Sequence, residues 1–414
     1  MTNADSGSPV TWRARTLRSS RGKLGIASPS SWWKVLPACA LLAAAACRDS
    51  SSVPATGPTH FVLTAAGALE LGGAGSGTAC VLTLFGGNAY CWGYNIAGNF
   101  GNGSTKSSNV PVPAGSGLSF AALSVSLWKS CGIEKSSLAL YCWGSNGPSG
   151  RNPNDLTPEL TPVLVDSSHK FKEVSQGSGS GCAVTVDEDA YCWGGGGERT
   201  LVFPLVKVPG GHAFKSVGVG DVSACGLTTQ GDAYCWPRDV RYGDTTDGPI
   251  ATPQLVAAQD HFMSLSVGSN HACGLTRSGE AFCWGYNSSG QLGIGTRDDD
   301  PHATPEPVAG KLTFSVLAAG PGSTCAITPA GVAYCWGGNS SGALGNGTTD
   351  NSNVPVKVAG NLTFVSIGSG AGSACGITDD GDVYCWGFNQ YGELGNGTNT
   401  GSLVPVKTLL TPTP

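Results

Sequence analysis

Cysteine is the residue with the most regular spacing in this sequence. Fourteen of the sixteen cysteines form seven pairs whose members lie 10 or 11 residues apart. This separation is far from the Cys-x-x-Cys spacing of zinc and thiol-redox sites, so we predict neither a metal nor a cofactor. On the two strands of a β-hairpin, residues this far apart face each other closely enough to form a disulfide. The predicted disulfide pairs are Cys80 with Cys91, Cys131 with Cys142, Cys182 with Cys192, Cys225 with Cys235, Cys273 with Cys283, Cys325 with Cys335, and Cys375 with Cys385.

One further cysteine, Cys47, follows an apolar segment near the N-terminus. Residues 1–34 carry six basic groups and a single acid, and the apolar run 35–46 is too short to span a bilayer as a helix. The small residues directly before Cys47 resemble a bacterial lipobox, although Ala44 stands where Leu is usual. We predict a signal peptide at 1–46, lipidation at Cys47 and a flexible tether at 47–58. The alternative is an ordinary cysteine beside a conventional cleavage site.

Three other patterns could carry chemistry, and we interpret each as structural. Gly338-Asn339-Ser340-Ser341-Gly342 matches the G-x-S-x-G pattern of nucleophilic serines, but it coincides with a recurring loop rather than a strand-to-helix turn. The six histidines show no metal-ligand spacing. The acidic triplets 187–189 and 298–300 lack the spacing of a calcium loop and are expected to be solvated turn residues. We predict no catalytic and no metal-binding residue.

The cysteine pairs recur inside a longer repeat. An aromatic-Cys-Trp core occurs seven times, at intervals of 43 to 52 residues, which is typical of propeller blades or solenoid units. We interpret these tryptophans as core residues, because they hold equivalent repeat positions. They are Trp92, Trp143, Trp193, Trp236, Trp284, Trp336 and Trp386.

Each repeat predicts four short strands. Residues 273–276 and 281–284 flank a turn that contains Gly279, so they form a hairpin, with Phe282 and Trp284 on one face and Cys283 on the other. A Pro-Val type strand follows each pair. With 63 Gly and 25 Pro in 414 residues, the composition favours a turn-rich all-β fold. We therefore predict a seven-bladed β-propeller over 59–414. We also expect the C-terminal strand at 403–407 to pair with the first blade and close the ring.

The repeat resembles that of the regulator of chromosome condensation family, in a bacterial secreted form with paired cysteines. The pattern G-x-x-H-x-C-x-L-T, followed by Cys-Trp-Gly and Gly-Gln-Leu-Gly, is clearest at 267–293 and recurs at 319–345 and 369–395. The family's histidine is present only as His271. The resemblance implies a seven-bladed propeller. Guanine-nucleotide exchange is not expected, since no long insertion between blades corresponds to the family's exchange features.

Charge and compartment limit the functions that we expect. Removing 1–46 takes six basic groups and one acid from a net charge of −5 and leaves −10, which disfavours nucleic-acid binding. Paired cysteines behind a signal peptide indicate an extracytoplasmic protein rather than one with reduced core cysteines.

The favoured function is that of a non-enzymatic, monomeric scaffold whose loops bind an unidentified protein or glycan. The membrane would be reached only through the lipid anchor. The alternative is an enzyme that cleaves polysaccharide or peptide at the central mouth, with Asp244, Asp247 and Glu198 as candidate acids and bases.

Overall fold

The computed structural model describes residues 61–62, 77–83, 86–126, 128–145, 157–194, 205–221, 223–237, 252–257 and 261–410. The chain divides into two compact units, 1–56 and 57–414, and every described residue belongs to the second. The predicted signal peptide, the lipidation site Cys47 and the whole of the predicted tether therefore lie outside the described residues. In the described part of the chain, no helix has the length and apolar character needed to cross a membrane.

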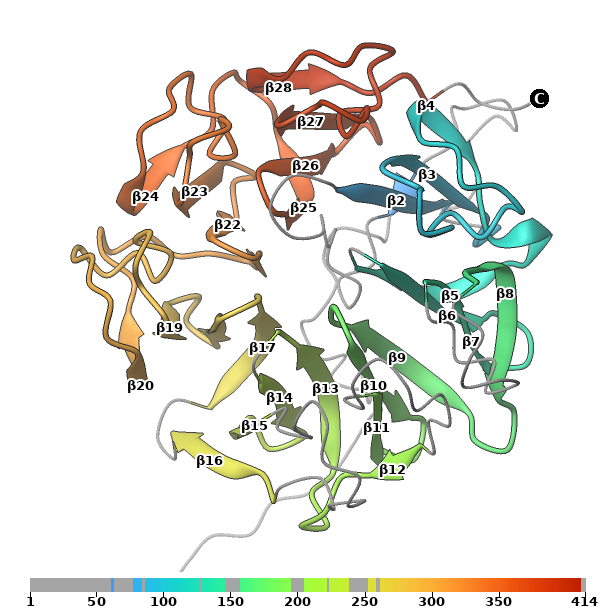
Figure 1. Ribbon diagram of the computed structural model, residues 1–414. Helices are drawn as coiled ribbons and strands as arrows, with labels where there is room; N and C mark the ends of the chain where they lie inside the picture. Colours follow the sequence, from blue (N-terminus) through green and yellow to red (C-terminus); the bar gives the residue numbers. More distant parts are fainter. Residues whose placement is uncertain are drawn as a thin grey trace, which may run out of the picture. The chain divides into compact units, whose positions relative to one another are not determined.

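The second unit is a seven-bladed β-propeller, as predicted. Its described residues form seven antiparallel sheets of four strands each, arranged radially (Figure 1), and one short 3-10 helix, η1 (Gly115–Gly117). Blade one holds β1 (Phe61–Val62), β2 (Thr78–Thr83), β3 (Ala89–Gly93) and β4 (Ser108–Pro113). Blade two holds β5 (Phe120–Val125), β6 (Lys129–Glu134), β7 (Leu140–Gly144) and β8 (Glu159–Asp166). Blade three holds β9 (Phe171–Gln176), β10 (Ser180–Thr185), β11 (Ala190–Gly194) and β12 (Val206–Lys207).

The remaining four blades repeat this arrangement. Blade four holds β13 (Phe214–Val219), β14 (Ser223–Thr228), β15 (Ala233–Pro237) and β16 (Gln254–Ala257). Blade five holds β17 (Phe262–Val267), β18 (His271–Thr276), β19 (Ala281–Gly285) and β20 (His302–Pro307). Blade six holds β21 (Val316–Ala319), β22 (Ser323–Ile327), β23 (Ala333–Gly337) and β24 (Ser352–Lys357). Blade seven holds β25 (Phe364–Ser369), β26 (Ser373–Thr378), β27 (Val383–Gly387) and β28 (Ser402–Lys407).

The predicted closure by the C-terminal strand is wrong. In every sheet the strands follow chain order, from the strand nearest the centre to the strand at the rim (Figure 1). β28 pairs with β27 inside blade seven, whereas β1 supplies the first strand of blade one. The Pro-Val type strand is the last strand of each repeat and pairs within the sheet of its own cysteine pair. The last of these strands, β28, therefore belongs to blade seven and does not complete blade one.

Side-chain contacts close the ring at the seam between blades seven and one. Ala79, Val81 and Trp92 of blade one pack against Ile377 and Cys385 of blade seven. This is the same kind of contact that joins every other pair of neighbouring blades, so the seam needs no shared sheet.

Each contact between blades combines a disulfide from one blade with aromatic rings from the next. In blade five, Cys273 lies directly opposite Cys283, as the hairpin prediction requires. Both cysteines pack against Phe314 and Trp336 of blade six. On the other face of the same sheet, Trp284 packs against blade four. The predicted two-faced hairpin is confirmed.

The glycine after the first cysteine of a pair makes room for the neighbouring phenylalanine. A Cβ atom added to Gly274 would lie 2.6 Å from Cδ1 of Phe262. Gly132 has the same relation to Phe120, at 2.5 Å. Because a real side chain cannot approach an aromatic ring so closely, glycine allows the close packing of this phenylalanine in blades two and five.

Candidate binding site on the loop face

A buried asparagine shapes the loop that follows the third strand of a blade. In blade seven, Oδ1 of Asn389 accepts a hydrogen bond from the Leu394 backbone at 2.9 Å, and Nδ2 donates to the Thr398 and Thr400 carbonyls at 3.1 and 2.9 Å. Asn95, Asn287 and Asn339 occupy the same position, and all four are at most 1% exposed. Since backbone groups hold each loop, its exposed side chains are free to differ between blades.

The repeat tryptophans fasten each of these loops to the next blade. Nε1 of Trp92 donates to the Glu393 carbonyl of blade seven at 2.8 Å. Nε1 of Trp143 donates to the Asn99 carbonyl of blade one at 2.7 Å. All seven repeat tryptophans are at most 6% exposed, so their interpretation as core residues is confirmed.

The loops share one face of the propeller with the turns between the first and second strands. The Ser145 backbone donates to the Trp128 carbonyl at 2.7 Å, and the Tyr286 backbone donates to the Asn270 carbonyl at 3.0 Å. Each of these bonds joins the start of a loop to the turn of its own blade. We call the side formed by these loops and turns the loop face.

Three aromatic side chains from different blades meet on the loop face. The ring of Tyr94 in blade one lies 5.1 Å from that of Tyr391 in blade seven and 6.3 Å from that of Trp128 in blade two, measured between centroids. The interplanar angles are 71° and 77°, so both contacts are edge-to-face. Trp128 is 41% exposed, and the two tyrosines are half-buried. We call these three residues the aromatic cluster.

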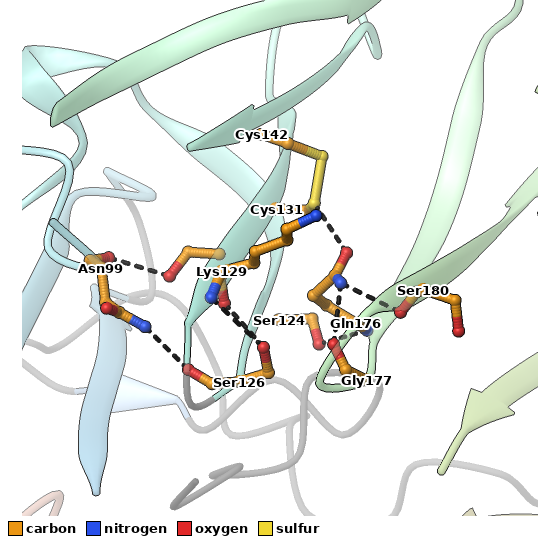
Figure 2. Close-up of a disulfide and its surroundings, with 10 residues drawn as sticks. Asn99, Ser124, Ser126, Lys129, Cys131, Cys142, Gln176, Gly177 and Ser180 are labelled. Carbon is orange, nitrogen blue, oxygen red and sulfur yellow. Dashed lines mark hydrogen bonds between the residues drawn. A yellow bond between two sulfur atoms is a disulfide. The ribbon is translucent and has the colours of Figure 1, made fainter. Parts of the chain in front are cut away.

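The turn that presents Trp128 is held in place by hydrogen bonds (Figure 2). The Ser126 backbone donates to the Lys129 carbonyl at 2.7 Å, and Nδ2 of Asn99 donates to the Ser126 carbonyl at 2.8 Å (Figure 2). The disulfide between Cys131 and Cys142 joins β6, the strand that follows this turn, to β7 (Figure 2). Hydrogen bonds and a disulfide therefore anchor the residues that flank Trp128.

The charged residues that adjoin the aromatic cluster in sequence, Glu393 and Lys129, are buried. Burial raises the pKa of Tyr94, with a smaller contribution from Tyr391. Glu393 is 0% exposed, and its carboxyl accepts the Tyr391 backbone N–H at 2.9 Å. Burial raises the pKa of Glu393 despite this hydrogen bond. Lys129, beside Trp128, is only 9% exposed.

The repeat does not require this cluster. The residues equivalent to Trp128 include Asn270, Gly322 and Gly372, and those equivalent to Tyr391 include Ser289 and Ser341. A residue that the fold needs recurs from blade to blade, as the core tryptophans do. An exposed tryptophan found in one blade alone is therefore not required by the repeat.

Comparison with protein-family patterns finds a known repeat in the C-terminal part of the chain. The Regulator of chromosome condensation (RCC1) repeat matches the chain at residues 278–327, 330–377 and 380–412, and a second form of that repeat matches 264–291 and 364–393. The chain therefore contains RCC1 repeats, and we call its second unit the RCC1-repeat propeller. Comparison with curated protein sequences gives no significant match.

Three solved structures similar to this RCC1-repeat propeller come from three different organisms. Prp20p from Saccharomyces cerevisiae gives a TM-score of 0.66 at 18% identity, over 80% of this chain and 88% of that one. Human WBSCR16 gives 0.68 at 17% identity, over 78% and 95%. The ectodomain of the Physcomitrella patens receptor kinase CR4 gives 0.51 at 22% identity, over 80% and 74%. At these identities the likeness establishes the shared fold alone.

All seven predicted cysteine pairs are joined as disulfides in the RCC1-repeat propeller. The Cα atoms of each pair lie 4.0 to 4.1 Å apart. Nearly all of the paired cysteines are buried between blades, where they form part of the core. Their role is to fasten the two central strands of each blade.

The residues proposed for the enzyme alternative are not described. Glu198, Asp244 and Asp247 lie outside the described residues, so a site at the central mouth stays a prediction. Ser340 of the G-x-S-x-G segment lies exposed in a loop turn. Among the described residues, no group of three histidine, cysteine or acidic side chains is placed to hold a metal ion.

The histidines are accounted for by local contacts within the described part. His302 lies between Asp298 and Glu306, and both carboxylates contact its ring nitrogens. The two carboxylates raise the pKa of His302. His271 is buried against Thr324 of blade six. Both histidines therefore organise loops and seams rather than a reaction site.

Sequence reasoning missed the aromatic cluster. Its members are 34 to 297 residues apart in the chain, and nothing in a single repeat brings them together. The available signal was a departure from the pattern: Trp128 and Tyr391 are aromatic where the equivalent positions of several blades carry small or polar residues.

Proposed function

We propose that this RCC1-repeat propeller is an exported, non-enzymatic binding protein that uses the aromatic cluster on its loop face to hold a partner. The observation that carries the proposal is Trp128, an exposed tryptophan that contacts a second blade and is not part of the repeat pattern. Aromatic residues of this kind supply most of the binding energy in many recognition surfaces. The core does not need them.

Export is supported by the chemistry of the cysteines. Seven disulfides persist in an oxidising compartment, whereas cytosolic reductants would oppose them. The ectodomain of receptor kinase CR4 has a similar fold, so such propellers can serve outside a cell. We propose a bacterial envelope protein anchored through Cys47, with a signal peptide at 1–46.

Protein binding by a propeller of similar fold also supports the proposal. The structure of Prp20p is described with its binding to Gsp1p and histones, so an RCC1-type propeller can present protein-binding surfaces. The rigid loops of the present chain suit recognition, because little conformational entropy is lost when they bind.

The test compares two exposed aromatic residues of the loop face. The purified propeller is immobilised and exposed to an envelope extract. The retained partner is then purified, and its binding to the propeller is measured. We expect Trp128→Ala to weaken binding about tenfold or more, which corresponds to about 1.4 kcal/mol. Tyr286→Ala is the matched control, since Tyr286 is 43% exposed at the position equivalent to Tyr94 but has no aromatic neighbour among the described residues.

Equal binding by the wild type and Trp128→Ala would refute the site. Export is tested separately. Free thiols in the purified native protein would contradict an oxidised exported form, and membrane association that persists in Cys47→Ala would contradict the lipid anchor.

A further inference from the structure

The aromatic cluster has the features of a carbohydrate-binding surface. We propose that Tyr94, Trp128 and Tyr391 bind a neutral oligosaccharide built of β-linked, gluco-configured pyranose rings. This inference rests on the proposed binding function and names its ligand class. It is carried by ring geometry, by unpartnered polar atoms and by the burial of Glu393 and Lys129, the charged residues that adjoin the cluster in sequence.

The ring geometry fits a flat sugar. A gluco-configured pyranose places its hydroxyls around the rim and directs C–H bonds from both faces, so each face can stack on the electron-rich surface of an indole. Trp128 is 41% exposed and is supported edge-to-face by Tyr94, which in turn meets Tyr391. Tyr94 contacts both of the other rings, so the cluster is a series of ring contacts with Tyr94 in the middle.

The polar atoms of the rings are available to sugar hydroxyls. Among the described residues, no hydrogen-bond partner is found for the hydroxyls of Tyr94 and Tyr391 or for Nε1 of Trp128. By contrast, the indoles of core residues such as Trp92 and Trp386 donate to buried carbonyls at 2.8 Å. The cluster thus offers two hydroxyls and one N–H beside apolar rings, a combination that binds amphipathic sugar rings.

The charge of the surroundings favours a neutral ligand. Glu393 and Lys129 adjoin the cluster in sequence, but they are 0% and 9% exposed. A basic or an acidic peptide would find no exposed opposite charge on either residue. The area also suits a sugar, because a stable protein interface covers about 800 Å² on each partner and three partly buried side chains expose far less.

The experiment measures binding of defined sugars to the disulfide-bonded protein. Cellohexaose and chitohexaose are titrated by calorimetry, with maltohexaose as the α-linked control. We expect saturable binding of a β-linked hexasaccharide, weakened about tenfold or more by Trp128→Ala and unchanged by Tyr286→Ala. Tyr94→Phe keeps the ring and removes the hydroxyl, so we expect an intermediate loss of about threefold to tenfold.

Three results would overturn the inference. They are no binding of either β-linked sugar up to about 10 mM, equal binding of maltohexaose, and equal losses in Trp128→Ala and Tyr286→Ala. Circular dichroism of each variant shows whether a loss reflects unfolding, and Trp128→Phe, which retains a ring, must keep part of the affinity. If no sugar binds while Trp128→Ala still abolishes binding of an envelope partner, the ligand class is wrong and the proposed function stands. If Trp128→Ala affects neither, both are wrong.

Discussion

His271 makes the stability of the propeller depend on pH in a way that the structure allows to be calculated. Its Nε2 lies 2.8 Å from Oγ1 of Thr324, and that hydroxyl donates its own proton to the Gln291 carbonyl at 2.8 Å. The hydroxyl must therefore accept from Nε2–H, which leaves the lone pair on Nδ1. Nδ1 is buried without a partner among the described residues. A second proton there would find no acceptor, and burial lowers the pKa of His271 to about 4.

The magnitude follows from the difference between the folded and unfolded pKa values. In the unfolded chain the pKa is 6.5, so between that value and about 4 the unfolded state binds a proton that the native state excludes. The free energy of unfolding therefore falls as the pH falls through this window. The total loss is about 3 kcal/mol, at about 1.4 kcal/mol for each pH unit.

The assay is urea unfolding, with the disulfides intact, of the wild type and of His271→Ser. Serine occupies the equivalent position in blades three, four, six and seven, as Ser180, Ser223, Ser323 and Ser373. For each pH, the free energy of unfolding of His271→Ser is subtracted from that of the wild type. We expect this difference to be about 3 kcal/mol larger at about pH 7.5 than at about pH 4, because all other titrating groups cancel in it. Thr324→Val serves as the control, since it removes the hydrogen bond but keeps the titrating ring. A constant difference between the wild type and His271→Ser across this range would refute the reasoning.

Three further predictions concern other parts of the propeller. Glu173 accepts the Val217 backbone N–H at 3.3 Å, and burial raises the pKa of its carboxyl to about 7. Glu173→Gln should therefore increase the free energy of unfolding at about pH 8 more than at about pH 5. The same increase at both pH values in urea unfolding would contradict this. Trp92→Phe leaves the Glu393 carbonyl without its indole donor and should lower stability by about 1 to 2 kcal/mol in thermal unfolding, with no change in hydrodynamic radius. Replacing Cys375 and Cys385 together by alanine removes a disulfide that closes a short loop and should cost about 2 to 3 kcal/mol in urea unfolding, so an unchanged midpoint would count against a stabilising role.

The repeat explains why so much of the fold could be predicted. Each blade repeats the same alternation, so the face of Phe282, the opposite face of Cys283 and the turn at Gly279 follow from a period of two and a short loop. Seven similar copies give seven chances to recognise the pattern. The disulfide pairs follow from the same hairpins, because their partners are close in the chain.

The prediction of ring closure failed for a reason that local pattern cannot reveal. The sequence shows where the strands occur, but the grouping of strands into sheets depends on which backbone edges meet. Phe61 of β1 is paired with Thr83, just as Phe262 is paired with Thr276 in blade five. This register places the first strand of each repeat ahead of its cysteine pair, and so leaves β28 inside blade seven.

The amino-acid sequence by itself determined the all-β class, the number of blades, the cysteine pairs and the RCC1-type repeat, since all of these are contacts between residues near in the chain. The tertiary structure alone decided how the ring is sealed and which side chains meet across the seams. Tyr94, Trp128 and Tyr391 converge because circular closure brings blade seven beside blade one. Contacts of that kind join residues far apart in the chain, and they arise only when every blade between them has packed on its neighbour.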